Sequence, residues 1–378
     1  MCYVGAIKAL KELNIELNAI AGSSVGAVFA ALLAVGYNEE EIKELFLDFN
    51  FNMFRDININ LFNTDISLSK GEIFLDWLRE KIGKKVLGDK YKNQTIRFKD
   101  IEKDLYILTL DINTNTPYIF SKEETPDEEI ALAVRTSASL PGLMKPINIG
   151  DSMLVDGDLM TSWPAWKIYN QLNTSENRLL EFRLEGSKED CDIKNPMAYL
   201  NSIISTIWYL CTENIFNSYY ANDRYDFVII DAKEVIIWDF TLDNKEKEKL
   251  VEKGYKTTKN YFLKSLPAKK NTILKIYEEI YKKTKLLSEA INKNLADDAQ
   301  NIINDILSSM YEDTKYIDIS IYEKLKELKE CINLNTKKHF MFTKIIDNEK
   351  QIKERNDFIT MLIKERIVDL KNYLKNFS

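Results

Sequence analysis

Gly-Ser-Ser-Val-Gly at residues 22–26 is the stretch that decides the fold of this 378-residue chain. It has the form G-x-S-x-G and stands between a strand-like segment, Ile15–Ala21, and an uncharged, helix-like segment, Val25–Val35. A serine on a sharp turn between a strand and a helix is exposed for nucleophilic attack. Only 12 residues of the chain are glycine, so this spacing seldom arises by chance. The pattern therefore predicts a nucleophile elbow.

The position of each residue in this elbow predicts its role. Ser24 is the central serine, and the absence of a Cβ at Gly22 and Gly26 is expected to remove collisions across the turn. The helix that begins at Val25 directs its unpaired N–H groups and positive dipole end toward the space beside Ser24. An oxyanion formed there would be stabilised. We therefore predict Ser24 as the nucleophile and the backbone N–H of Val25 as an oxyanion donor.

A membrane span is the alternative interpretation of this region. Ala19–Val35 carries no charge and is close to the shortest segment that crosses a bilayer. However, it contains glycines and serines, it is followed by the acidic run Glu39–Glu41, and no cluster of Lys or Arg flanks it. These features favour a buried elbow over a span.

A serine nucleophile needs a base, and the composition restricts the candidates. The only histidine, His339, stands in a Lys-flanked, helical part of the chain, a setting typical of a surface residue. Asp156 follows the apolar run Met153–Val155 and precedes Gly157, which places it at a strand end or in an ordinary Asp-Gly turn. A carboxylate becomes an effective base when it is partly desolvated and hydrogen-bonded to the serine. A Ser-Asp dyad is therefore favoured, with a Ser-His-Asp triad through His339 as the weaker alternative.

Several sequence blocks together resemble the patatin-like phospholipases, and they occur in that family's order and spacing. The blocks are Gly5–Leu10, similar to the first helix of the family, Gly22–Gly26, similar to its elbow, Ala133–Gly142, similar to its R-A-S-x-S-x-P-G block, and Asp156-Gly157 with Pro164, similar to its D-G-G-x-x-x-N-x-P motif.

The resemblance implies an α/β fold of three layers with a largely parallel central sheet. It also implies hydrolysis of the carboxylic esters of membrane or micellar acyl lipids through an acyl-enzyme, with a Ser24–Asp156 dyad and no metal or other cofactor. Gly157 and Arg135 are supporting residues in this comparison. The resemblance places Arg135 near lipid phosphate or in contact with the Asp156 loop. Its position alone is also typical of an arginine that faces the dipole at a helix C-terminus.

Three departures from the family pattern bear on activity. The glycine-rich oxyanion loop of the family and the strand before it are expected ahead of Gly5, but the sequence starts at Met1, so we expect weak activity from the chain as given. Asp158 replaces the family's Gly or Ala, and a second carboxylate near Asp156 tends to raise the pKa of the first. Ser162 replaces its usual Asn.

The composition suits a globular enzyme. Apolar residues make up 45% of the chain and charged residues 29%, and the formal net charge of −7 argues against a nucleic-acid partner. The four cysteines have neither metal nor disulfide spacing, and no secretory signal is visible. We expect a cytoplasmic protein, either free or peripheral at a membrane surface.

The chain is expected to have two parts. Strand-like and helix-like segments alternate in residues 1–245, where Leu105–Asp111 and Pro117–Ser121 are predicted to form a hairpin. Beyond them glycine becomes rare and apolar residues recur at helical spacing. We predict an acyl hydrolase domain at 1–245 and a helical domain or cap at 246–378. The alternative is a catalytically impaired protein of the same fold that binds lipid, or a protein partner through the helical region.

Overall fold

The computed structural model describes residues 1–47, 69–141, 143–159, 178–185, 225–232, 242–312, 316–338 and 345–375, together with 199, 202, 203 and 206. The chain forms two compact units. The first consists of Met1–Ile215 and Phe227–Lys259, and the second of Phe216–Asp226 and Asn260–Ser378. A compact unit need not fold independently, so the division into domains at 1–245 and 246–378 stays a prediction.

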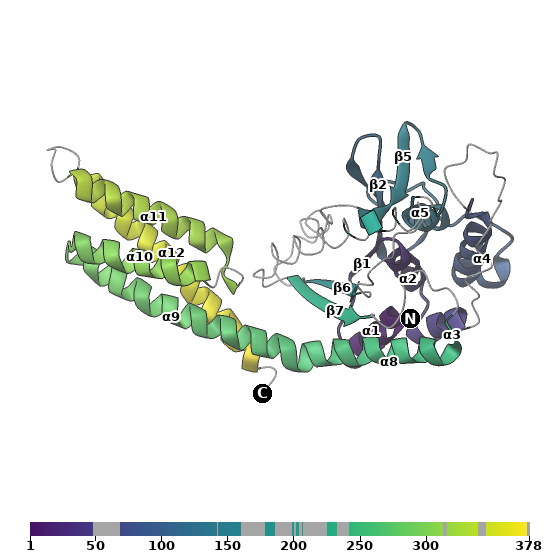
Figure 1. Cartoon of the computed structure of the whole chain (residues 1–378), viewed down its shortest axis with the longest axis horizontal. Coiled ribbons are helices and arrows are strands. Elements are labelled where there is room, and N and C mark those ends of the chain that lie inside the picture. The colour runs from purple at the N-terminus through teal and green to yellow at the C-terminus, as the bar shows by residue number, and fades with distance from the viewer. Residues whose placement is uncertain are drawn as a thin grey trace. The chain divides into compact units, whose positions relative to one another are not determined.

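The first unit combines strands with helices that pack on them (Figure 1). Its helices are α1 (Cys2–Glu12), α2 (Val25–Ala34), α3 (Glu39–Leu47), α4 (Glu72–Leu87), α5 (Ile130–Ser137) and α8 (Asn244–Asn260), with 3-10 turns η2 (Gly88–Lys90), η3 (Phe98–Asp100) and η4 (Gly157–Leu159). Its strands are β1 (Ala19–Gly22), β2 (Asp104–Asp111), β3 (Thr116–Ser121), β4 (Ile147–Ile149), β5 (Ser152–Asp156) and β6 (Leu179–Glu185), which pairs with β7 (Tyr225–Asp231). The predicted strand before the elbow and helix after it are confirmed.

Two strands meet end to end along β2, and this register positions the site. β1 runs parallel to the first half of β2, with Gly22 opposite Ile107. β5 runs antiparallel to the second half, with Asp156 opposite Thr109. The carboxyl ends of β1 and β5 therefore approach each other from opposite directions on either side of Leu108. Side chains that follow these two ends are brought close together.

The sheet is mixed, whereas we expected a largely parallel one. In the five-stranded sheet of the described residues, β1–β2 is parallel, and β2–β3, β2–β5 and β4–β5 are antiparallel. The reason is local, because residues 112–115 and 150–151 are connections too short for a parallel crossover. Positive φ angles at Asn115 (55°) and Gly150 (57°) allow these tight turns. The predicted hairpin of 105–111 and 117–121 is confirmed.

Helix α2 is the central helix of this unit. It contacts β1, β2 and α5, and all its residues from Ala27 to Leu32 are buried. A helix that is apolar on every side is stable only when it is covered, which explains why this segment carries no charge. It has 10 residues, too few to cross a bilayer. Among the helices that the structure describes, none has the length and apolar character of a membrane span.

Helices α1 and α8 cross at unusually close range. A Cβ on Gly5 would lie 1.8 Å from the carbonyl oxygen of Val251, and one on Gly254 would lie 1.9 Å from that of Cys2. Each helix thus presents a glycine where the backbone of the other approaches. These two glycines fix α8 against the first helix of the chain.

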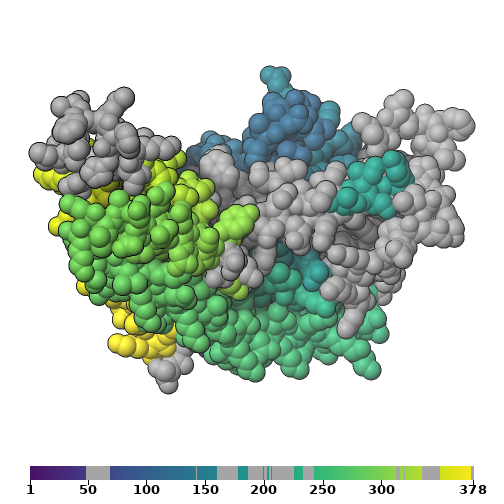
Figure 2. Space-filling model, turned by 60° about the vertical axis from the view of Figure 1, so that its left-hand side comes forward, coloured from purple at the N-terminus to yellow at the C-terminus, as the bar shows by residue number. Residues whose placement is uncertain are grey.

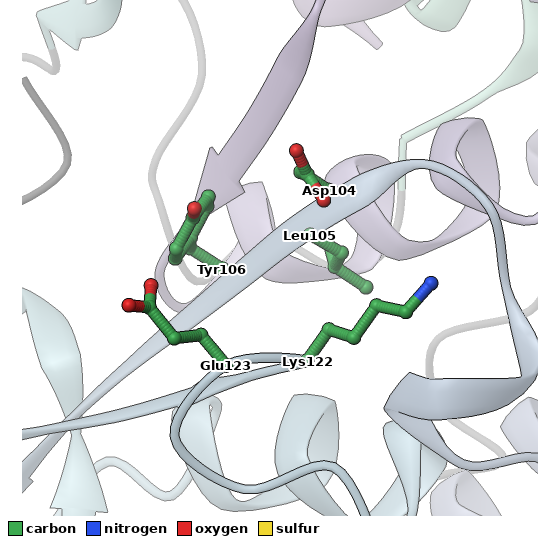
Figure 3. A pocket seen from close by; sticks show the side chains of 5 residues that line it. All are labelled: Asp104, Leu105, Tyr106, Lys122 and Glu123. Carbon is green, nitrogen blue, oxygen red and sulfur yellow. The ribbon is translucent and has the colours of Figure 1, made fainter. Parts of the chain in front are cut away.

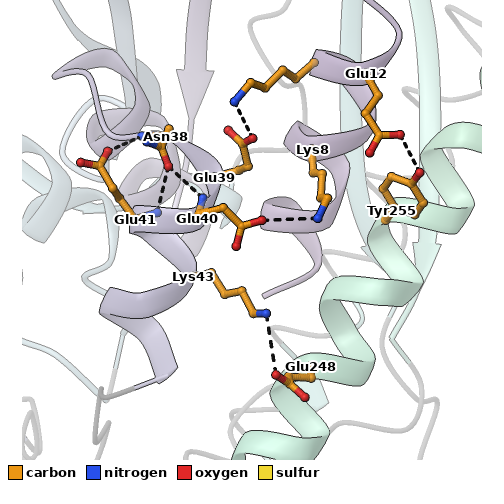
Figure 4. A network of polar contacts seen from close by, with 10 residues as sticks. Lys8, Glu12, Asn38, Glu39, Glu40, Glu41, Lys43, Glu248 and Tyr255 are labelled. Atoms are coloured by element: carbon orange, nitrogen blue, oxygen red, sulfur yellow. Dashed lines mark hydrogen bonds and ion pairs between the residues drawn. The ribbon is translucent and has the colours of Figure 1, made fainter.

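Polar contacts surround this crossing (Figure 4). Glu12 of α1 accepts a hydrogen bond of 2.6 Å from the Tyr255 hydroxyl of α8. Lys43 of α3 lies 3.7 Å from Glu248 of α8. Such exposed pairs contribute little stability one by one, but they add polar contacts between α8 and both α1 and α3. Helix α8 is therefore an integral part of the first unit.

The second unit is a bundle of helices, drawn in green to yellow in Figure 2. It contains a π-helical turn at Tyr261–Ser265, then α9 (Leu266–Asn292), α10 (Ala296–Glu312), α11 (Ile319–Lys338) and α12 (Ile345–Lys375). Helices α9 and α11 each contact both α10 and α12. Ile303, Leu325 and Ile363 are fully buried in its core. The predicted helical C-terminal extension is confirmed.

The α1–α8 crossing gives a stability prediction. Gly254→Ala should lower the free energy of unfolding by about 1–3 kcal/mol, because the added methyl group forces two backbones apart. The measurement is denaturant or thermal unfolding of the whole chain. The control is Lys249→Ala, an exposed position on the same helix, which should change stability by no more than about 0.5 kcal/mol. Equal stability of Gly254→Ala and wild type would contradict the close crossing.

Candidate active site

Ser24 has a strained backbone at the entrance to α2. Its φ is 49° and its ψ is −127°, a combination that costs a residue with a side chain about 1–3 kcal/mol. Gly22 makes this turn possible, because a Cβ there would lie 2.4 Å from the carbonyl oxygen of Gly26. The prediction that a Cβ at Gly26 would also collide across the turn is wrong. Apart from its chain neighbours and the nearby backbone of α2, no heavy atom of the described residues lies within 4 Å of a Cβ built on Gly26, so the steric demand for glycine falls on Gly22.

Hydrogen bonds hold the elbow in this conformation. The N–H of Ser24 donates to the hydroxyl of Ser137 at 3.0 Å. The Ser137 hydroxyl in turn donates to the carbonyl oxygen of Leu108 at 2.6 Å. Ser137 is the last residue of α5, so the elbow is connected to both α5 and β2. This connection fixes the direction in which the Ser24 side chain leaves the turn.

The side chain of Ser24 meets the carboxylate of Asp156. Its hydroxyl donates to Asp156 Oδ2 at 2.7 Å. The second oxygen, Oδ1, accepts the N–H of Asp158 at 2.9 Å, and the N–H of Asp156 donates to the Ser139 carbonyl oxygen at 3.1 Å. Both oxygens and the backbone of Asp156 are thus held. The structure brings together the two residues that the sequence selected, one just after β1 and the other at the end of β5.

The surroundings of Asp156 change its acidity. Asp156 is 1% exposed, and burial raises the pKa of its carboxyl well above the ordinary value. The negative charge of Asp158 raises this pKa further, whereas the hydrogen bonds from the Asp158 N–H and Ser24 lower it. A carboxylate with a raised pKa is a stronger base once it is ionised. The site therefore has the electrostatic character that a base for serine requires.

Gly157 allows the Asp156 turn to approach β2. A Cβ on Gly157 would lie 2.3 Å from the carbonyl oxygen of Leu108 and 3.1 Å from Cβ of Ser23. Any side chain here would displace the turn that carries Asp156. The close approach of the turn to β2 therefore requires glycine at position 157, which an ordinary Asp-Gly turn would not.

Arg135 points into the protein and is 2% exposed. Its Nη1 donates to Ser139 Oγ at 2.7 Å and to the Lys145 carbonyl oxygen at 2.6 Å, and its Nη2 donates to the Lys70 carbonyl oxygen. Burial lowers the pKa of Arg135 to about 10. Since the guanidinium is engaged by protein oxygens, this geometry favours a role in holding the residues next to the Asp156 strand over contact with lipid phosphate.

Of the remaining predicted residues, Val25 lies beside the site, and three others are not among the described residues. Val25 is the first residue of α2 and is 44% exposed, and N–H groups in the first turn of a helix have no carbonyl one turn earlier to pair with. His339, Ser162 and Pro164 lie outside the described residues.

A cavity on the sheet has neither Ser24 nor Asp156 in its lining. It has a volume of about 240 Å³ and is lined by Asp104, Leu105, Tyr106, Lys122 and Glu123 (Figure 3). It lies at the half of β2 that pairs with β1, and Lys122 there donates to the Ile101 carbonyl oxygen at 3.1 Å. In the part of the chain that the structure describes, no three His, Cys, Asp or Glu side chains are grouped to hold a metal ion.

Comparison with known proteins places this geometry in a family. Residues 1–166 match the family model described as Patatin-like phospholipase. The chain contains a patatin-like domain. The strand, elbow and helix at Ser24 and the strand that ends at Asp156 all lie within the matched residues.

The chain has relatives among viral proteins. It is 29% identical over 269 residues to an uncharacterized protein of Acanthamoeba polyphaga mimivirus, covering 69% of this chain and 89% of the relative. It is 26% identical over 181 residues to a probable lipid hydrolase of Invertebrate iridescent virus 6, covering 46% of this chain and 62% of that protein.

A solved structure is similar in fold. VipD from Legionella pneumophila matches with a TM-score of 0.50 and 14% sequence identity, covering 98% of this chain and 87% of that one. The predicted fold class, α/β of patatin-like type with a helical C-terminal extension, is confirmed.

Three serines of the patatin-like site received no role from the sequence. Ser137 holds the Ser24 N–H, Ser139 accepts the Asp156 N–H, and Ser23 donates to the carboxylate of Asp158. The signal for the first two was present in the Arg-Thr-Ser-Ala-Ser run at 135–139. Their partners, however, depend on how α5 packs on β2 and β5.

The contacts of Arg135 give a second prediction. Arg135→Lys should lower the free energy of unfolding by about 1–3 kcal/mol, because an ammonium group cannot reproduce the fork that reaches the Lys70 and Lys145 carbonyl oxygens. Unfolding by denaturant measures the change. The exposed Arg97→Lys is the matched control and should change stability by no more than about 0.5 kcal/mol. If both variants behave alike, Arg135 is not an anchor.

Proposed function

We propose that this protein is a lipid acyl hydrolase that cleaves the carboxylic esters of phospholipids or related acyl lipids through a Ser24–Asp156 dyad. One observation carries the proposal: the 2.7 Å hydrogen bond from the hydroxyl of Ser24, on a strained turn, to the buried carboxylate of Asp156. The match to the patatin-like phospholipase model supports the lipid substrate. We assign the chemistry to residues 1–245 and treat 246–378 as a helical extension.

The first step forms an acyl-enzyme. Asp156 Oδ2 accepts the proton of Ser24 as the Ser24 oxygen attacks the ester carbonyl carbon. The carbonyl oxygen becomes an oxyanion beside the N-terminus of α2, where the N–H of Val25 donates to it. When the tetrahedral intermediate collapses, the alcohol leaves with the proton that Asp156 held. Ser24 then carries the acyl group, and Asp156 is ionised again.

The second step releases the fatty acid. Asp156 accepts a proton from water as the water oxygen attacks the acyl carbon. Collapse of this intermediate returns the proton from Asp156 to the Ser24 oxygen and frees the carboxylic acid. One carboxylate thus serves both steps. The raised pKa of Asp156 suits this double role, because the group must both accept and give up a proton.

The nucleophile assignment predicts a labelling pattern. A fluorophosphonate probe should modify Ser24 alone, because activation requires both the elbow and the Asp156 carboxylate. Peptide mapping by mass spectrometry of the labelled chain checks this. Labelling that persists in Ser24→Ala would contradict the assignment. An unlabelled wild-type chain would favour the alternative of a non-catalytic protein that binds lipid or a protein partner.

The base assignment separates a dyad from a triad. Asp156→Asn should slow labelling by about 10²–10⁴-fold, the usual contribution of a general base, with no gross change in melting temperature. His339→Ala should leave the labelling rate unchanged. Asp151→Asn, which removes the same charge at the other end of β5, is the matched control. If His339→Ala loses activity as severely as Asp156→Asn, a Ser-His-Asp triad replaces the dyad.

A further inference from the structure

A second serine–aspartate pair lies directly beside the dyad. The hydroxyl of Ser23 donates to Asp158 Oδ1, while that of Ser24 donates to Asp156 Oδ2. Two neighbouring serines of the elbow therefore contact two carboxylates of one short turn, Asp156-Gly157-Asp158. The turn has no room to retreat, because Gly157 packs against the Leu108 carbonyl oxygen. The dyad does not use Asp158 in either chemical step.

Asp158 also contacts Asp156 through its backbone. Its N–H donates to Asp156 Oδ1 at 2.9 Å, so the carboxylate that accepts the Ser24 proton is oriented by the residue that carries the second charge. The contact between Ser23 and Asp158 fixes that residue in turn. The elbow and the Asp156 turn are thus joined by two parallel hydrogen bonds and not by the dyad alone.

The titratable groups around Asp158 come from three elements. They are Asp156 on β5, Arg183 and Glu181 on β6, and Tyr3 on α1. Arg183 attracts the Asp158 carboxylate, but its Nε donates to Glu181, whose own negative charge opposes that attraction. Burial raises the pKa of Asp158, and the hydrogen bond from Ser23 lowers it. The negative charge on Asp158 is therefore only partly compensated by its neighbours.

We propose that Asp158 is a positioning residue for the dyad, which clamps the elbow through Ser23 and places a second negative charge where it strengthens Asp156 as a base. This proposal rests on the proposed function of Ser24 and Asp156. The sequence supports it, since Asp158 stands where resemblance to the patatin family leads us to expect Gly or Ala. Gly or Ala at that position can supply neither the clamp nor the charge.

The negative charge of Asp158 affects the pKa of Asp156 and thereby the pH dependence of the reaction. A negative Asp158 stabilises the protonated form of Asp156 and so raises its pKa. Attack by Ser24 requires ionised Asp156, so the rate should fall as pH drops through this raised pKa. Removing the charge should lower the pKa of Asp156 and move the acid limb of the profile to lower pH. The same change should reduce the rate on the alkaline plateau, because a weaker base activates serine less well.

The experiment is the rate of fluorophosphonate labelling of Ser24 against pH, in the full chain. Asp158→Asn keeps the shape of the side chain and removes its charge. We expect its acid limb to move down by about one pH unit or more, with a lower plateau. Asp151→Asn is the control for net charge, because Asp151 is an exposed residue on the hairpin before β5, and its profile should match wild type. An acid limb that does not move in folded Asp158→Asn would overturn the proposal.

Two further variants keep the test decisive. Ser23→Ala retains the charge and removes the clamp, so it should slow labelling without the shift seen for Asp158→Asn. An equal shift in both variants would contradict a role for the charge. If Asp158→Asn does not fold, Asp158→Ala, which introduces a residue type of the family, should show the same shift. Failure of wild type to label Ser24 would reject the proposed function itself, whereas normal labelling with unmoved profiles would reject this inference alone.

Discussion

The meeting of two strand ends on β2 is the constraint on which the site depends. β1 approaches Leu108 from one direction and β5 from the other, and both must leave room for the turns that follow them. Gly22 and Gly157 provide that room, since a Cβ on either would lie within 2.4 Å of a backbone oxygen. The Leu108 carbonyl also accepts the hydroxyl of Ser137, which holds the elbow. One peptide group of β2 thus organises the contacts of Ser24 and Asp156.

The strained turn and the buried carboxyl groups of the site lower the free energy of unfolding, and packing elsewhere in the first unit must offset this loss. Ser24 adopts a strained turn, and Asp156 and Asp158 carry raised pKa values. The unfolded chain releases these protons near pH ~3.9, whereas the folded chain retains them to higher pH. Stability should therefore fall as pH rises from that value through the folded pKa values. The covered helix α2 and the α1–α8 crossing lie in the same unit and offset such losses by close packing.

The elbow was predictable because its signal is local. Strand, turn and helix are contiguous around Ser24, and two glycines mark the turn. Asp156 was selected from its strand end, the following glycine and the resemblance of this stretch to the patatin-like motif. The roles of Ser137 and Ser139 were not predictable, because neither the hydroxyl of Ser137 nor the backbone carbonyl of Ser139 reveals in sequence which strand α5 packs on. The same holds for Arg135, whose acceptors Lys70 and Lys145 come from separate segments.

The expectation of a largely parallel sheet failed for a related reason. Alternating helices and strands suggested crossovers. The antiparallel hairpin of β2 and β3 was predicted, but the antiparallel pairing of β5 with β2 and of β4 with β5 was not. β4 has three residues and no distinctive pattern, so this strand could not be predicted from its residues. The elbow could be predicted from contiguous residues, whereas the pairing of β5 with β2 depends on segments far apart in the sequence.

The central claim is that Ser24 becomes acylated with Asp156 as its base. The direct measurement is acid quenching of the protein during turnover of an acyl ester, followed by mass mapping of its peptides. The account predicts the mass of the acyl group on the peptide that contains Ser24, and its loss in Ser24→Ala. Ester hydrolysis that proceeds with no acylated peptide, or with the acyl group on another residue, would contradict it.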